Sequence, residues 1–177
     1  MIFALDTSAT RTGWCLGAPL GPAILGHALF GGHGDNIGAL LADFRDWLSE
    51  RLDRHQPSLI AFEKPVRPMA QGNLLVFRQL YGIAGMVELV ALDHKIPAYE
   101  VDNQQVKKLF YGSGGKKPGK ADGLALAAQW GFEADNMDEA DAAGVWMKTI
   151  EQRHPEAFRQ WERLRAERMV ECGARLL

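Results

Sequence analysis

Three short apolar segments, separated by turn residues, open the chain before any helical pattern begins. They cover residues 2–5, 12–18 and 23–30, and their short connections, rich in glycine and proline, predict an antiparallel meander. Strand-like segments at residues 58–62 and 97–101 then alternate with long helical patterns. Elements in this order form a mixed sheet that helices cover on both faces. We therefore expect an α/β fold with five strands, three in the meander and two parallel.

The helical segments are recognised by apolar residues three and four positions apart. The first follows a capping residue, Asn36, and runs to about residue 54. The second, residues 72–92, is apolar on most of its faces, which predicts either a central core helix or a surface between two subunits. Further helices are expected at residues 103–110, 121–130, 138–150 and 156–176.

The length of 177 residues suits one domain and is too short for two. We expect residues 1–150 to form the α/β domain and the charged stretch 151–177 to be a helix packed on it. Apolar residues make up 47% of the chain and charged residues 24%, as in soluble globular proteins. We expect no apolar run long enough to span a membrane, and the first residues lack the pattern of a secretion signal. A cytoplasmic protein without a membrane partner is therefore the expectation.

Cysteine and histidine residues do not form a metal-binding pattern in this sequence. Cys15 and Cys172 are far apart, and we expect both to stay reduced. The five histidines show no spacing typical of metal ligands. Any metal ion must then be held by carboxylates, which favours a hard ion such as Mg²⁺ or Mn²⁺.

Four acidic residues occur on the elements from which a carboxylate metal site is built. Asp6 and Glu63 each follow a buried strand, while Asp138 and Asp141 lie three positions apart at the start of a helix. If the two strands are neighbours, their acids meet at one edge of the sheet. Carboxylates that converge in this way can hold two divalent ions about 3.5–4 Å apart, an arrangement that hydrolyses phosphodiesters.

Each acid also has a structural alternative. Asp6 can cap the turn that follows it, and Glu63 can pair with Lys64 or Arg67. Asp138 is a suitable N-cap, and the aspartate three residues later suits the positive end of the helix dipole. We favour the metal-binding interpretation for the four acids together, because all of them stand on the required elements.

A stretch of basic residues without any acid lies between residues 107 and 120. It contains the lysines Lys107, Lys108, Lys116, Lys117 and Lys120. On a chain with a net charge of −2, this local concentration fits contact with phosphate groups. A solvated loop explains the charge alone equally well.

Four segments resemble motifs of the RuvC family of Holliday-junction resolvases, which have an RNase H-like fold. In the family's order, they are Ala4-Leu5-Asp6-Thr7-Ser8 with Thr12-Gly13-Trp14, Ile60-Ala61-Phe62-Glu63-Lys64-Pro65, Val106-Lys107-Lys108 with Lys120, and Asp138-Glu139-Ala140-Asp141-Ala142-Ala143. The resemblance covers about residues 2–150.

The resemblance implies a homodimeric endonuclease that depends on Mg²⁺ and nicks opposed strands of a four-way DNA junction. Two Mg²⁺ ions, which Mn²⁺ can replace, would be held by Asp6, Glu63, Asp138 and Asp141. Lys107 and Lys120 would lie near the scissile phosphate and act in catalysis. The remaining DNA contacts are expected from Lys108, Lys116, Lys117 and Arg67.

One segment departs from the family pattern. Cellular members tend to carry an aromatic residue shortly after the glutamate, whereas this chain has Val66-Arg67-Pro68-Met69. We therefore expect strand separation and sequence preference to differ, as in phage-type members of the family.

Other functional classes fit the sequence less well. Residues 114–120 nearly match a phosphate-binding P-loop, but Ala121 stands where that loop needs serine or threonine. The chain is too short for a helicase core, despite its Asp-Glu-Ala-Asp segment, and for the second domain of an actin-like ATPase. Two alternatives stay open: an RNase H-like nuclease acting on RNA or on other branched DNA, and a catalytically silent DNA-binding module of the same fold.

Overall fold

The computed structural model describes residues 1–65, 73–112 and 119–174. A sheet in the order β3-β2-β1-β4-β5 forms its centre. Its strands are β1 (Ile2–Asp6), β2 (Arg11–Gly17), β3 (Ala23–Leu29), β4 (Leu59–Glu63) and β5 (Ala98–Val101). The first three pair antiparallel as a meander, and β4 is parallel to both β1 and β5. The predicted five-stranded mixed sheet is therefore confirmed.

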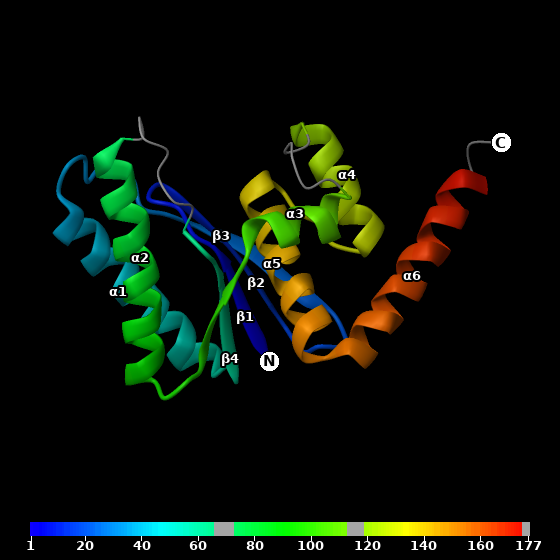
Figure 1. The fold of residues 1–177 in the computed structure, drawn as a ribbon, viewed down its shortest axis with the longest axis horizontal. Coiled ribbons are helices and arrows are strands. Elements are labelled where there is room, and N and C mark those ends of the chain that lie inside the picture. Colours follow the sequence, from blue (N-terminus) through cyan, green and yellow to red (C-terminus); the bar gives the residue numbers. More distant parts are fainter. Residues whose placement is uncertain (66–72, 113–118, 175–177) are drawn as a thin grey trace.

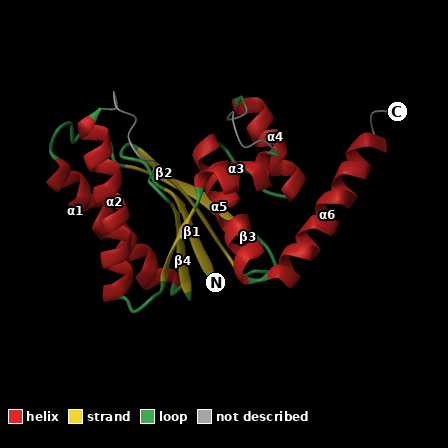
Figure 2. Cartoon of the chain, viewed as in Figure 1, coloured by secondary structure: helices red, strands yellow, loops and turns green. Residues whose placement is uncertain are grey.

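Helices cover both faces of this sheet (Figure 2). On one face lie α1 (Ile37–His55) and α2 (Leu74–Asp93). On the other lie α3 (Asn103–Tyr111), α4 (Lys120–Trp130), α5 (Met137–Arg153) and α6 (Pro155–Ala174). Side chains alternate between the two faces of each strand, so one sheet supplies two separate apolar cores.

Capping residues explain where several helices begin. The Asn36 side chain accepts a hydrogen bond from the Ala39 amide at the start of α1, as predicted. At the start of α5 the cap is Asn136, whose side-chain oxygen accepts from the amides of Asp138 and Glu139. The suggestion that Asp138 is the N-cap was therefore wrong, because that residue already lies inside the helix.

The α2 helix is more exposed than a core helix usually is. By length and composition alone it could cross a membrane, with a mean hydropathy of 1.5, so the expectation that no apolar run reaches that length was wrong. Part of α2 nevertheless packs inward, since Ile83, Val87 and Val90 are buried in the core shared with α1 and the sheet. Leu89 and Leu92 remain 50% and 72% exposed.

The α6 helix lies against α4 and α5 before it extends away from the sheet (Figure 1). Phe158 and Trp161 are buried near its start, and the Trp161 indole donates a hydrogen bond to the Pro19 carbonyl at 3.0 Å. Further along, Arg168 donates to the Trp130 carbonyl at 3.0 Å. These contacts connect the charged C-terminal segment to the apolar core that α5 forms with its face of the sheet.

Candidate active site

Two carboxylates meet at the ends of neighbouring parallel strands. In the register of β1 and β4, Leu5 lies opposite Phe62, so the chain places Asp6 and Glu63 next to each other at the carboxyl edge of the sheet. Both residues are partly exposed, and both line a cavity of about 200 Å³. The predicted meeting of these two strand-end acids is present in the structure.

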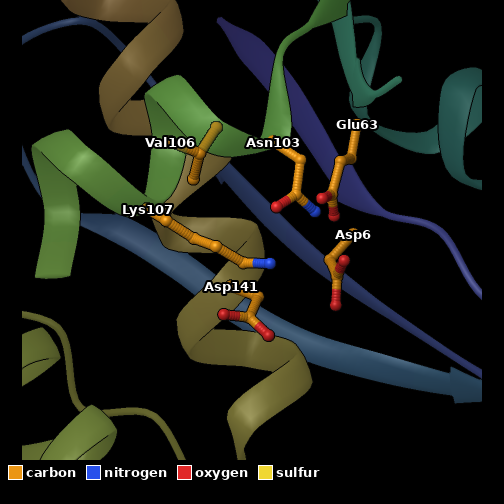
Figure 3. Close-up of a pocket in the computed structure, with 6 residues that line it drawn as sticks. All are labelled: Asp6, Glu63, Asn103, Val106, Lys107 and Asp141. Carbon is orange, nitrogen blue, oxygen red and sulfur yellow. The ribbon is translucent and has the colours of Figure 1, made fainter. Parts of the chain in front are cut away.

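The α5 helix brings a third carboxylate to the same cavity because Gly13 lets the helix approach the sheet closely. Gly13 is the β2 partner of Asp6, and a Cβ atom placed on it would lie only 1.9 Å from the Asp138 carbonyl oxygen. The first turn of α5 therefore rests on the backbone beside Asp6. Asp141 follows in this helix, is 9% exposed and lines the cavity (Figure 3).

The α3 helix forms the remaining wall with Asn103, Val106 and Lys107. The Lys107 side chain extends toward the space between Asp141 and Asp6 (Figure 3). A cation so placed offsets the negative charge of the surrounding carboxylates, and it is available to a phosphate group that enters the cavity.

A buried tyrosine reports the electrostatic character of this site. The Tyr111 hydroxyl donates a hydrogen bond to Asp141 Oδ1 at 2.6 Å. Burial raises the pKa of Tyr111 far above its ordinary value, and the charge and hydrogen bond of Asp141 raise it further, followed by the charges of Asp6 and Glu63. All three carboxylates therefore act on the same buried hydroxyl group. Negative charges gathered in this way attract cations.

Asp138 is not among the residues that line this cavity. Its carboxylate accepts a hydrogen bond from Arg11 at 3.3 Å. Its neighbour Glu139 is buried and accepts hydrogen bonds from the Asp135 amide and the Asn136 side chain, with His27 Nδ1 at 2.7 Å. The structure thus brings together three of the four predicted acids, with the fourth on the adjoining surface.

The predicted basic residues are divided in the same way. Lys107 lines the cavity, whereas Lys108 is exposed and absent from its lining. Lys120 is exposed at the first residue of α4 and does not line the cavity either. The other predicted DNA contacts lie outside the described residues: Arg67, Lys116 and Lys117.

The structure tests part of the alternatives suggested by the sequence. Lys64 lies 3.9 Å from Glu100 on β5, so this lysine pairs with a residue other than Glu63. The alternative partner Arg67 lies outside the described residues. In the turn after β1, the Ser8 hydroxyl accepts from the amides of Thr10 and Arg11.

The donor set fits a hard divalent cation. Asp6, Glu63 and Asp141 offer carboxylate oxygens and Asn103 an amide, which are the ligands preferred by Mg²⁺ and Mn²⁺. Across the described part of the chain, the acidic, histidine and cysteine side chains do not form a ready-made group of three or more around one point. Lys107 extends into that space, so metal binding here requires the side chains to rearrange.

A second, smaller cavity adjoins the first. It has a volume of about 120 Å³ and shares Glu63 and Asn103 with the larger one. Its other lining residues are Thr7, Lys64, Pro65 and Leu80. The two cavities together form a depression along the carboxyl edge of the sheet.

Sequence reasoning missed two residues of the site. Asn103 was detectable in principle, because it follows β5, whose Val101 pairs with Glu63, and thus reaches the same sheet edge. Tyr111 had no such signal, since its position depends on how α3 packs across α5.

Comparison with known proteins identifies structural relatives only. No family model matches the sequence, and no curated protein matches it. RuvC of Thermus thermophilus has a TM-score of 0.60 at 16% identity, covering 85% of this chain and 95% of that chain. The same protein in complex with a Holliday junction substrate has a TM-score of 0.62 at 15% identity, covering 81% and 89%.

The yeast mitochondrial Holliday junction resolvase Ydc2 has a TM-score of 0.57 at 10% identity, covering 98% of this chain and 83% of that chain. At these identities the comparisons establish the fold. The RNase H-like fold of RuvC-type resolvases, expected from the four sequence motifs, is confirmed.

Proposed function

We propose that this protein is a structure-selective DNA endonuclease that resolves four-way junctions by hydrolysing one phosphodiester in each of two opposed strands. The observation that carries the proposal is the convergence of Asp6, Glu63 and Asp141 with Lys107 in one cavity at the carboxyl edge of the sheet. The resolvases named above have the same fold, and one of them was solved with a Holliday junction substrate. Branched DNA is therefore the proposed partner.

Two Mg²⁺ ions, or Mn²⁺ in their place, are the proposed cofactors. Asp6, Glu63 and Asp141 would hold them, and Asp138 would join after its carboxylate leaves Arg11. When bound, the ions would lower the pKa of a water molecule and neutralise the charge on the scissile phosphate. The Lys107 ammonium extends toward the same carboxylates (Figure 3), so we expect it to shift when the ions enter.

The protein's own side chains would position the DNA. Lys107 lines the cavity and can pair with a non-bridging oxygen of the scissile phosphate, where negative charge grows in the transition state. Lys108 and Lys120 are exposed outside the cavity, where they can contact neighbouring phosphates. Such contacts set affinity and register but do not read the base sequence.

Paired nicking requires two active sites, and α2 is the proposed surface between two copies of the chain. Four large apolar side chains on α2 fall on one side of the helix at spacings of seven, eight and three residues. They are Leu74, Tyr81, Leu89 and Leu92, between 41% and 72% exposed. Exposed apolar side chains that recur on one side of a helix are typical of subunit interfaces.

The stripe can be tested by comparing two charged substitutions at residues of equal exposure. Leu92→Glu places a charge in the stripe, while Val170→Glu, at a residue on α6 that is also 72% exposed, is the matched control. We expect L92E to sediment as a monomer and V170E to behave as the wild type. A monomeric wild-type protein at micromolar concentration would exclude the dimer and with it the coupled nicking.

The catalytic proposal is tested by cleavage of four substrates in the presence of Mg²⁺: a four-way junction, a flap, a linear duplex and an RNA–DNA hybrid. We expect symmetric paired nicks in the junction only. Cleavage of the hybrid would favour an RNase H-like ribonuclease, and cleavage of the flap would favour a nuclease for other branched DNA. Junction binding without cleavage by the wild type would identify a catalytically silent binding module.

Substitution of the carboxylates separates chemistry from binding. Asp6→Asn and Asp141→Asn keep the side-chain size and remove the charge that would hold the cations. We expect both variants to lose cleavage and to bind the junction as the wild type does, because the lysines remain. Equal loss of binding and cleavage would contradict the assignment of these residues to the metal site.

A further inference from the structure

The Tyr111 hydroxyl makes a short, buried hydrogen bond to a carboxylate of the proposed site. Its donor–acceptor distance to Asp141 Oδ1 is 2.6 Å, and the two residues are 7% and 9% exposed. Hydrogen bonds from a hydroxyl to a carboxylate are short and strong when water is excluded. Tyr111 itself is not among the residues that line the cavity, and its hydroxyl is linked to the site through this carboxylate.

The surroundings hold the tyrosine in place from two directions. At Gly144, three residues beyond Asp141 on α5, a Cβ atom would lie 2.9 Å from Val106 on α3, so the missing side chain allows the two helices to approach closely. The C-terminal end of α3 is fixed by the Trp130 indole, which donates to the Phe110 carbonyl at 3.2 Å. Gly144 lies about one helical turn from Asp141, and Phe110 directly precedes Tyr111, so both features lie close to the hydrogen-bonded pair.

We infer that Tyr111 is a positioning residue that orients the Asp141 carboxylate for a divalent cation. The inference rests on the proposed function, since it concerns the same carboxylate site. The phenol fixes the rotation of the carboxylate about its Cβ–Cγ bond. A carboxylate oxygen has two lone pairs, so accepting this hydrogen bond does not prevent Asp141 from coordinating a cation. Residues that orient metal ligands in this way typically change metal affinity by about 10–100-fold when they are replaced.

The test compares two substitutions that each remove a single hydroxyl group. Tyr111→Phe deletes the bond to Asp141 and retains the ring. Tyr99→Phe is the matched control, because the Tyr99 hydroxyl donates to Gln152 at 2.9 Å outside the lining of the site. Mn²⁺ binding is measured by calorimetry on the DNA-free protein below the melting temperature of every variant. We expect Y111F to bind Mn²⁺ about 10-fold or more weakly and Y99F to bind as the wild type does.

A second pair of measurements asks whether Tyr111 acts through Asp141. In an Asp141→Asn background, Y111F should cause no further loss of Mn²⁺ affinity, whereas independent effects would add. Junction cleavage by Y111F should recover at high Mn²⁺ concentration, because weak binding is overcome by mass action. A purely structural tyrosine would instead lower the melting temperature without changing Mn²⁺ affinity, and that result would overturn the inference.

The wild-type protein provides a measurement that does not depend on whether Y111F folds. The chain has three tyrosines, so ¹³C labelling of their hydroxyl-bearing carbons gives three resonances. Mg²⁺ should shift the resonance of Tyr111 and leave that of Tyr99 unchanged; no shift at Tyr111 while cation binding is detected would refute the inference. If the wild type binds neither Mg²⁺ nor Mn²⁺, the proposed function itself fails, which is a distinguishable result.

Discussion

The close approach of α5 to the sheet at Gly13 provides a direct test of how the site is assembled. A Cβ atom at Gly13 would lie 1.9 Å from the Asp138 carbonyl oxygen and 2.3 Å from its carbon. Ordinary van der Waals contact begins at 3.4 Å, so the Gly13→Ala variant is about 1.5 Å short of the required space. Both obstructing atoms belong to the backbone, so no change of side-chain rotamer relieves the clash.

Either α5 retreats from β2 or the strand bends in the G13A variant. Overpacking of this kind typically costs about 1–3 kcal/mol of stability, and a clash with backbone falls at the upper end or beyond. The same movement carries Asp141 away from Asp6, because Gly13 is the strand partner of Asp6. Since a displacement of about 1 Å at a reacting centre can cost about 100-fold in rate, junction cleavage should fall by about that factor or more.

Urea unfolding gives the change in stability, and single-turnover cleavage of a four-way junction gives the change in rate. Gly31→Ala is the matched control, because a Cβ atom there meets nothing within 4 Å and its φ is not in the left-handed region. G31A should stay within about 0.5 kcal/mol of the wild type. If G13A unfolds at the same urea concentration as the wild type, the close approach of α5 to β2 is refuted, whatever the result of the cleavage assay.

Two further predictions concern a neighbouring pair of lysines and a buried thiol. Lys107→Ala should slow single-turnover junction cleavage by about 10-fold or more, since this lysine lines the cavity. Lys108 is exposed outside the cavity, so Lys108→Ala should mainly weaken DNA binding and reduce its salt dependence. Equal effects of the two substitutions on cleavage would contradict these separate roles. Burial raises the pKa of the Cys15 thiol well above its ordinary value, so at pH 8 the group is protonated and shielded. Peptide mapping after iodoacetamide treatment should show Cys15 alkylated only in urea, and rapid labelling of the folded protein would contradict its burial.

Local sequence patterns determined the elements of this fold and their order. Apolar runs and turn residues identified all five strands, and the caps and apolar spacing located the helices to within a few residues. Asp6 and Glu63 were predictable as neighbours, because parallel strands that end in acids present them at the same edge of the sheet. These inferences need only the periodicity of nearby residues and the rules by which strands are connected.

Tertiary packing decided the rest. The sequence does not reveal that Asp138 pairs with Arg11 while Asp141 lines the cavity, since the two residues lie three positions apart on one helix. It also does not reveal that Tyr111 meets Asp141, because that contact depends on two helices crossing at Gly144, thirty-three residues beyond the tyrosine in the sequence. A side chain's neighbours across such a crossing depend on helix rotation and separation, which are fixed by the whole packed core and not by the local pattern of residues.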